Sequence, residues 1–253
     1  MLHSVTFGEK NTWDDWGLVP VKQPVFAPPV PKTKYLPING ADGEIDVSTA
    51  ITGYPVFENR KGSLSFLAPQ GHAAWLSTYT EIMAYLHGKK LQAILEDDPA
   101  WYYEGRFACK QMAMDEQHGT ITIDYVVDPY KWALTTTTDS DWLWDPFSFV
   151  DGVIYTGIFT GIALTTTETA LEYDYTSAGG APVKPVFSAT GGAVTLYIGS
   201  STTAMINSGA SKTVDGLVLY GGSWLLDGEA VTVTAKASSG TATLAIDFRA
   251  GRL

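Results

Sequence analysis

Three pairs of adjacent acidic residues are the part of this sequence best suited to acid–base chemistry. The pairs are Asp14-Asp15, Asp97-Asp98 and Asp115-Glu116. Glycoside hydrolysis uses two carboxyl groups held across a cleft, one as an acid and the other as a base or nucleophile. All three pairs fall in segments that read as turns, where acidic side chains usually bond their own backbone and stay in water. We therefore interpret them as turn residues, with a cell-wall hydrolase that uses one pair as an alternative.

Side chains that could hold a metal ion or a cofactor are few and poorly spaced. The stretch Asn39-Gly-Ala-Asp-Gly-Glu-Ile-Asp46 begins like a calcium loop, but it lacks the further ligand spacing and the glutamate at the twelfth position. The four histidines, His3, His72, His87 and His118, include no helical pair with a third ligand. His87 suits the last turn of a helix, where the dipole favours a partly positive ring. We expect no metal and no cofactor, and a turn between two strands at residues 39–46.

Motifs for covalent catalysis and phosphate binding are also missing from the sequence. There is no Gly-x-Ser-x-Gly motif, and the single cysteine, Cys109, has no obvious partner. We interpret Cys109 as a small buried hydrophobic residue in a strand. The segment Ser208–Thr213 imitates the end of a phosphate loop without its leading glycine or its strand-to-helix setting. We therefore expect no enzymatic activity.

Three tryptophans in the C-terminal half could bind a sugar. Trp142, Trp144 and Trp224 carry the flat aromatic faces on which sugar rings stack in carbohydrate-binding sandwiches. Core packing is the reading that we favour for all three. Tryptophan is also enriched at protein interfaces, and this chain has eight. A carbohydrate-binding host-adhesion module therefore stays open as an alternative function.

The composition indicates a globular, acidic chain. Its 253 residues are 45% hydrophobic and 17% charged, which suffices for one large or two ordinary domains. Sixteen basic residues against 27 acidic ones give a net charge of −11, which repels a phosphate backbone. The first twenty residues lack a basic segment before an apolar run, and no stretch approaches about 18 apolar residues. We expect no specific nucleic-acid binding, no signal peptide, no membrane insertion and synthesis in the cytoplasm.

A change in composition near Trp132 predicts two domains, 1–132 and 133–253. In the second, small residues dominate, and short alternating segments such as Glu229–Ala237 and Thr241–Phe248 are separated by glycine and serine turns. This pattern predicts an all-β sandwich. The first domain is predicted to be α+β and mostly β, with strands that include Tyr102–Met114 and Thr120–Val127.

One helix is predicted in the first domain, between Pro69 and Gly88. A single apolar stripe marks it, formed by Trp75, Tyr79, Ile82, Met83 and Leu86. Gly88 can take the left-handed conformation that ends a helix.

Six prolines fall within the eighteen residues from Pro20 to Pro37. Proline lacks the N–H that a sheet ladder needs and favours an extended, stiff chain. A stiff segment loses little entropy when it lies across a partner, so we interpret residues 20–37 as an arm for subunit contact. The residues chosen as candidates for the subunit interface are Trp13, Trp16, Pro28, Pro29 and Tyr35.

Three blocks of the sequence resemble the distal tail protein family of long-tailed, non-contractile bacteriophages, the siphophages. The first block is Tyr35–Ser48, with Tyr54, Asn59 and Arg60 following. The second is Leu86–Arg106, which reads as a helix end, a strand, a turn at Asp97-Asp98-Pro99 and a second strand. The third is Ile121–Trp132, which closes the first domain.

The resemblance implies a mainly β, two-domain fold. The first domain would be barrel-like with one helix, related to tail-tube subunits, and the second a galectin-like β-sandwich. Sugar-binding galectins use a cluster of His, Asn, Arg and Trp. Residues 133–253 contain no histidine, and Arg249 and Arg252 are their only arginines. We therefore expect the second domain to be a docking platform and not a lectin.

The resemblance also implies a function in the virion. Six copies would close into a ring, the hub of the tail tip, and the stacking of such rings is left open. The hub would join the tail-tube protein to the tail-tip or baseplate proteins and to the receptor-binding protein. An acidic lumen in such a ring would let DNA pass without adsorbing.

Overall fold

A computed structural model describes residues 2–40, 42–68, 71–114, 119–137, 147–148, 153–154, 160–172, 180–200 and 202–253. Their contacts divide the chain into two compact units. Unit 1 comprises Met1–Pro31 and Phe57–Trp132, and unit 2 comprises Lys32–Val56 and Ala133–Leu253. The contacts of residues 32–56 therefore group this segment with the C-terminal part of the chain.

Unit 1 is an antiparallel sheet covered by one helix. Its strands are β1 (Val5–Phe7), β2 (Lys10–Asn11), β3 (Val19–Pro20), β6 (Arg60–Ala68), β7 (Lys90–Leu95), β8 (Trp101–Cys109), β9 (Ala113–Met114), β10 (Gly119–Val127) and, at the boundary, β11 (Lys131–Ala133). They are hydrogen-bonded in the order β2-β1-β7-β8-β10-β6-β3, and β9 pairs with β10. The longest ladder joins β6 and β10, in which Arg60 to Ala68 lie opposite Val127 to Gly119. Alternate residues of β10 are buried, as its period of two predicts.

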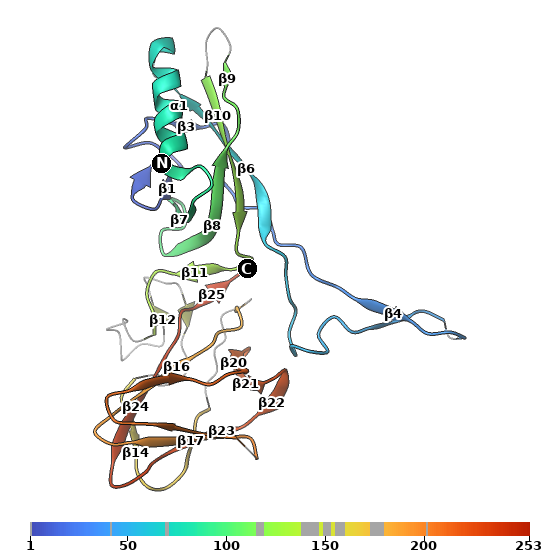
Figure 1. Ribbon diagram of the computed structural model, residues 1–253, viewed down its shortest axis with the longest axis vertical. Coiled ribbons are helices and arrows are strands. Elements are labelled where there is room, and N and C mark those ends of the chain that lie inside the picture. The colour runs from blue at the N-terminus through green and yellow to red at the C-terminus, as the bar shows by residue number, and fades with distance from the viewer. Residues whose placement is uncertain are drawn as a thin grey trace. The chain divides into compact units, whose positions relative to one another are not determined.

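Helix α1 (His72–Leu86) contacts β8 and β10 (Figure 1). Trp75, Ile82 and Leu86 are buried in the core of unit 1, and Tyr79 and Met83 pack against the same core, so the predicted stripe is confirmed. The helix ends where predicted because Gly88 has a φ of 74°, which a residue without a Cβ adopts at little cost. The amide of Gly88 donates to the Phe107 carbonyl at 2.7 Å and ties the helix end to β8.

The hairpin of β7 and β8 follows the helix as predicted, but β8 is shorter than expected. The predicted strand Tyr102–Met114 ends at Cys109, and β9 is a separate strand of two residues. Met112, between the two, is buried with 7% exposure and lies beside Trp75 around Gly119. Ile123 lies opposite Cys109 and Thr120 opposite Ala113, so the segment between β8 and β9 has one residue more than β10, as in a β-bulge.

Unit 2 consists of short strands. They are β4 (Tyr35–Pro37), β5 (Glu44–Asp46), β12 (Phe147–Ser148), β13 (Val153–Ile154), β14 (Ile162–Leu164), β15 (Thr169–Ala170), β16 (Val186–Thr190), β17 (Val194–Ile198), β18 (Thr202–Ile206), β19 (Ser211–Thr213), β20 (Leu217–Tyr220), β21 (Ser223–Leu226), β22 (Glu229–Val231), β23 (Val233–Ala237), β24 (Ala242–Asp247) and β25 (Gly251–Arg252). Two four-stranded sheets have the orders β14-β24-β16-β19 and β15-β23-β17-β18, and a third sheet has the order β20-β21-β22. The pairs β4–β5 and β12–β13 form two small hairpins.

The two four-stranded sheets form the predicted β-sandwich. Phe187, Leu244 and Ile246 of one sheet and Leu196 and Ile198 of the other have no solvent exposure. Along each strand these residues alternate with less buried ones, which is the pattern of sheets packed on one face. The predicted strand Glu229–Ala237 is in fact two strands, β22 and β23, which belong to different sheets. The mainly β fold, with its helix in unit 1, agrees with the predicted fold class.

Ile82 and Leu76 offer a matched test of the helix packing. Ile82 is fully buried, whereas Leu76, on the same helix, is 62% exposed. We expect Ile82→Ala to lower the free energy of unfolding of unit 1 by about 2–5 kcal/mol, because it leaves a cavity. Leu76→Ala should change it by about 0.5 kcal/mol or less. Denaturant unfolding followed by tryptophan fluorescence measures both, and equal losses in the two variants would contradict the described packing.

Candidate interaction surfaces

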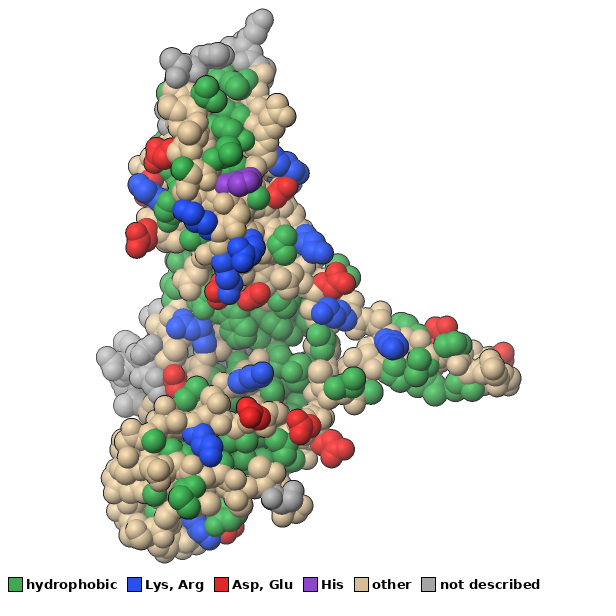
Figure 2. All heavy atoms as spheres, in the orientation of Figure 1, with side chains coloured by type: hydrophobic (Ala, Val, Ile, Leu, Met, Phe, Trp, Pro, Cys, Tyr) green, Lys and Arg blue, Asp and Glu red, His purple; other side chains and the backbone are tan. Residues whose placement is uncertain are grey.

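Residues 32–56, which share only residues 32–37 with the predicted arm and which we call the arm from here on, carry an exposed hairpin. Tyr35 lies opposite Asp46, Leu36 opposite Ile45, and Pro37 opposite Glu44. All six residues of β4 and β5 are exposed. Figure 2 shows hydrophobic side chains along much of this hairpin, which no other strand pairs with in the described part of the chain. A two-stranded hairpin is marginally stable by itself in water, so a further strand or a packed face from a partner would stabilise the arm.

The end of the arm packs closely against the turn between β21 and β22. A Cβ on Gly53 would lie 2.4 Å from the carbonyl oxygen of Gly228, and a Cβ on Gly228 would lie 2.3 Å from that of Ile51. Beside this contact, the rings of Tyr54 and Tyr220 are 5.1 Å apart. Two backbones can approach so closely only where both residues lack a side chain. The glycines therefore fix the end of the arm to the β21–β22 turn within unit 2.

Arg60 is the first residue of β6, the strand by which the chain returns to unit 1 after the arm. Its side chain is 5% exposed. Nε donates to the Pro129 carbonyl at 2.8 Å and Nη1 to the Ala27 carbonyl at 3.1 Å, while the guanidinium lies 5.4 Å from the centre of the Tyr103 ring. Burial lowers the pKa of Arg60. One buried cation thus joins the segment before the arm, the strand after it and the end of β10.

The five predicted interface residues differ in exposure. Trp13 is 38% exposed and Tyr35 is 50% exposed, Pro28 is exposed and Pro29 is half-buried. Trp16 is only 2% exposed, and its indole N–H donates to Glu81 Oε1 at 3.2 Å. A subunit contact in this region would therefore use the Trp13 ring and not the Trp16 ring. The assignment of these five residues to an interface stays a prediction.

The turn between β7 and β8 carries three consecutive acids, Glu96, Asp97 and Asp98, which we call the acidic turn. Its place between two strands is as predicted. The carboxylates do not simply bond their own backbone, however, because each reaches a distant segment of unit 1. The contacts are Ser4 N to Glu96 at 2.8 Å, His3 Nδ1 to Asp97 at 2.8 Å, Gln23 Nε2 to Asp97 at 3.0 Å, and an ion pair of Lys131 with Asp98. These groups are occupied by structural bonds, which argues against the Asp97-Asp98 pair as catalytic acids.

The structure describes some of the other candidate acids and metal ligands. Asp15 forms an ion pair with Lys10 at 2.7 Å, whereas Asp115 and Glu116 lie outside the described residues. The described residues 39–40 and 42–43 lie between β4 and β5, as predicted for a turn between two strands, whereas residues 44–46 form β5 itself. Within the described ranges, no three His, Cys, Asp or Glu side chains gather where they could hold a metal ion.

His87 and Cys109 form a structural contact at the end of the helix. Nδ1 of His87 accepts the Cys109 amide hydrogen at 3.1 Å, so the ring binds β8, which the sequence interpretation as a dipole partner missed. Burial raises the pKa of the Cys109 thiol to about 11, as suits the predicted buried hydrophobic residue and not a nucleophile. The side chain of His72 and residue His118 lie outside the described residues.

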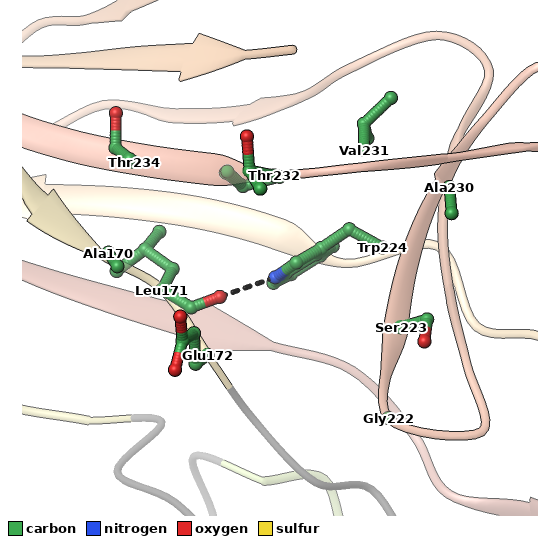
Figure 3. Close-up of a pocket in the computed structure, with 11 residues that line it drawn as sticks. Ala170, Leu171, Glu172, Gly222, Ser223, Trp224, Ala230, Val231, Thr232 and Thr234 are labelled. Atoms are coloured by element: carbon green, nitrogen blue, oxygen red, sulfur yellow. Dashed lines mark hydrogen bonds between the residues drawn. The ribbon is translucent and has the colours of Figure 1, made fainter.

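Trp224 lines a cavity of about 790 Å³ on unit 2, which Figure 3 shows. Its side chain is 5% exposed, and its indole N–H donates to the Leu171 carbonyl at 2.6 Å. A sugar-stacking ring must present a face to solvent, so Trp224 has the role of a core residue, as favoured from the sequence. Glu172 is the one charged side chain among the described residues that line the cavity. Trp142 and Trp144 lie outside the described residues.

The comparisons with known proteins support the fold. No protein-family model matches the chain, and no curated protein sequence matches it. Among solved structures, the chain is similar to the Dit protein (gp 19.1) of phage SPP1, with 13% identity over the full length of both chains and a TM-score of 0.56. That protein is described as a paradigm of the hub adsorption apparatus in phages that infect Gram-positive bacteria. The resemblance to distal tail proteins inferred from the sequence is thereby confirmed at the level of the fold. Among the described residues, no helix is both long and apolar enough to span a membrane.

The acidic turn predicts a dependence of stability on pH. Hydrogen bonds from His3 and then Gln23 hold the pKa of Asp97 below its usual range. A carboxyl with a lowered folded-state pKa adds stability above its ordinary pKa of about 3.9, and this is lost as the pH falls through the lowered value. We expect Asp97→Asn to lower the melting temperature near neutral pH. Below about pH 4, the melting temperature of the variant should decrease less steeply with falling pH than that of the unchanged chain. Asp14→Asn, at an exposed carboxylate, is the control, and identical pH profiles for both variants would refute the assignment.

The glycine contact at the end of the arm predicts a difference between two alanine variants. Gly228 and Gly209 both have positive φ, 88° and 79°, but an added Cβ at Gly209 meets nothing within 4 Å. The left-handed conformation costs an alanine about 1–2 kcal/mol at either site. We expect Gly228→Ala to lose more stability than Gly209→Ala and to speed hydrogen exchange at the Gly53 amide, which bonds Thr49. Equal losses and unchanged exchange would show that the contact is absent in solution.

Proposed function

We propose that this chain is a structural subunit of a siphophage tail tip, a hub that assembles through its arm into a ring of six copies. The observation that carries the proposal is the correspondence of its fold, over the full length of both chains, with the SPP1 Dit hub protein. The exposed hairpin of the arm supports it, because β4 and β5 present apolar side chains that a single copy leaves in water. The protein would act in the virion, and its role requires no catalysis.

The partners follow from this role. A hub ring would contact the tail-tube protein on one side and the tail-tip or baseplate proteins and the receptor-binding protein on the other. The sandwich of unit 2 would serve as a docking platform. The net charge of −11 supports a ring through which DNA passes without specific binding.

Association in solution tests the proposal directly. We expect light scattering of the purified chain to give six times the 27.3 kDa of one copy, and negative-stain images to show rings. A chain that stays monomeric and binds or degrades cell-wall polymer would instead support the adhesion or hydrolase alternative.

The arm variant Ile45→Ser should weaken association about tenfold or more, because the buried apolar contact is lost. Ile45 is 50% exposed in the single copy. Met205→Ser, at a 60% exposed residue of β18, is the matched control and should leave association unchanged. Sedimentation velocity over a range of concentrations measures both variants, and a normal ring with Ile45→Ser would remove the arm from the proposal.

A further inference from the structure

Strand β6 is paired along its whole length on one side and only in part on the other. The ladder with β10 covers every residue from Arg60 to Ala68. On the opposite side, β3 pairs only with Phe66 and Leu67, and the Val21 amide donates to the Ser65 carbonyl at 2.9 Å. Among the described strands, none pairs with residues 60–64 on this side.

The direction of the unpaired backbone groups follows from the alternation along a strand. The Ser65 carbonyl points away from β10, because it bonds Val21. Thr122, opposite Ser65 on β10, accepts the Lys110 amide at 2.8 Å on the far side of that strand, which agrees with this direction. Lys61 and Ser63 therefore also direct their N–H and C=O groups away from β10. We call these groups the open edge of β6.

A preformed groove runs beside the open edge. Its volume is about 440 Å³, and its lining includes Lys22, Val25, Gly62 and Tyr125. The opposite wall is held in place by two bonds, from the Ala27 amide to the Tyr125 hydroxyl at 2.8 Å and from Gln23 to Asp97 at 3.0 Å. Lys22 and Lys61 are exposed, and neither makes an ion pair with a described residue. The groove thus has Lys22 in its lining and Lys61 beside it, and it is bordered by backbone donors and acceptors that no described strand pairs with.

Strand β5 of the arm has the complementary edge. The Val47 amide donates to the Lys34 carbonyl at 2.9 Å, so the backbone groups of Val47 point toward β4. By the alternation along a strand, the backbone groups of Ile45 also point toward β4, where Leu36 lies opposite. The N–H and C=O groups of Glu44 and Asp46 then point away from β4. The corresponding outward edge of β4 contains Pro37, which has no N–H. The β5 edge therefore carries two residues, spaced by two, with unused backbone groups and acidic side chains.

We propose that β5 of one copy pairs with the open edge of β6 of a second copy, and so adds a strand to its sheet. This inference rests on the proposed ring, because it names the surface that receives the arm. With Glu44 and Asp46 opposite Lys61 and Ser63, one carboxylate faces Lys61 whichever way the strands run. Ile45 then points to the other face, beside Gly62, where the Tyr125 hydroxyl occupies the place that a side chain would take.

A proline at Ser63 tests the backbone pairing. The Ser63 amide is not part of the ladder with β10, so proline is tolerated there as it is on edge strands. We expect Ser63→Pro to keep the far-UV circular dichroism and melting temperature of the single copy and to weaken association at least about tenfold, because a donor of the interface is removed. Ser63→Ala keeps that donor and should associate like the unchanged chain.

Charge exchange tests the partner edge independently, also if Ser63→Pro fails to fold. Lys61→Glu alone should weaken association, and so should the one of Glu44→Lys and Asp46→Lys whose carboxylate faces Lys61. Combining Lys61→Glu with whichever arm variant faces it should restore the ring, and the restoring pair gives the strand direction.

Rings that form normally with Ser63→Pro, or single losses that no combination restores, would overturn the pairing and leave the proposed function standing. A chain that stays monomeric at every concentration would overturn both.

Discussion

The structure depends on the pairing of strands, and among the described residues the hairpin of β4 and β5 and residues 60–64 of β6 lack a further strand on one side. The hairpin of β4 and β5 has too few strands to bury its own apolar side chains. The open edge of β6 is left because the proline-rich segment leaves the sheet after Val21. Hydrogen bonds of Arg60 and Gln23 hold the segment that lies beside this edge. Arg60 ties Ala27 to Pro129, and Gln23 is held by Asp97 of the acidic turn.

The residues that could do chemistry are used as structural ties. Asp97 holds His3, Glu96 holds the Ser4 amide, and His87 receives the Cys109 amide. Each is a polar group that links segments far apart in the sequence, and two of these bonds hold the N-terminal residues His3 and Ser4 to the acidic turn. A subunit that must keep its shape while it bears contacts on several sides benefits from such ties. These uses fit a structural subunit better than an enzyme.

Local patterns in the sequence were sufficient to predict much of this fold. The stripe of Ile82 and Leu86 predicted helix α1, and Gly88 predicted its end, because both signals depend on neighbouring residues. The arm was harder to predict. The prolines marked residues 20–37, whereas contacts group residues 32–56, because pairing of β4 with β5 and the Gly53–Gly228 approach join residues distant in sequence. Trp13 and Trp16 look alike in sequence, and only packing against Tyr85 and Glu81 shows that Trp16 is the buried one.

The two unfinished edges are unlike each other, and this determines what kind of assembly they can build. A donor strand and an acceptor edge make a heterologous contact, which propagates from copy to copy until it closes on itself or continues as a filament. In a closing assembly the last contact is intramolecular, so its effective concentration is far higher than that of free subunits. Contacts that are weak between two copies can therefore hold a complete ring firmly. The sparse pairing along β5 would then favour an assembly that forms only as a whole.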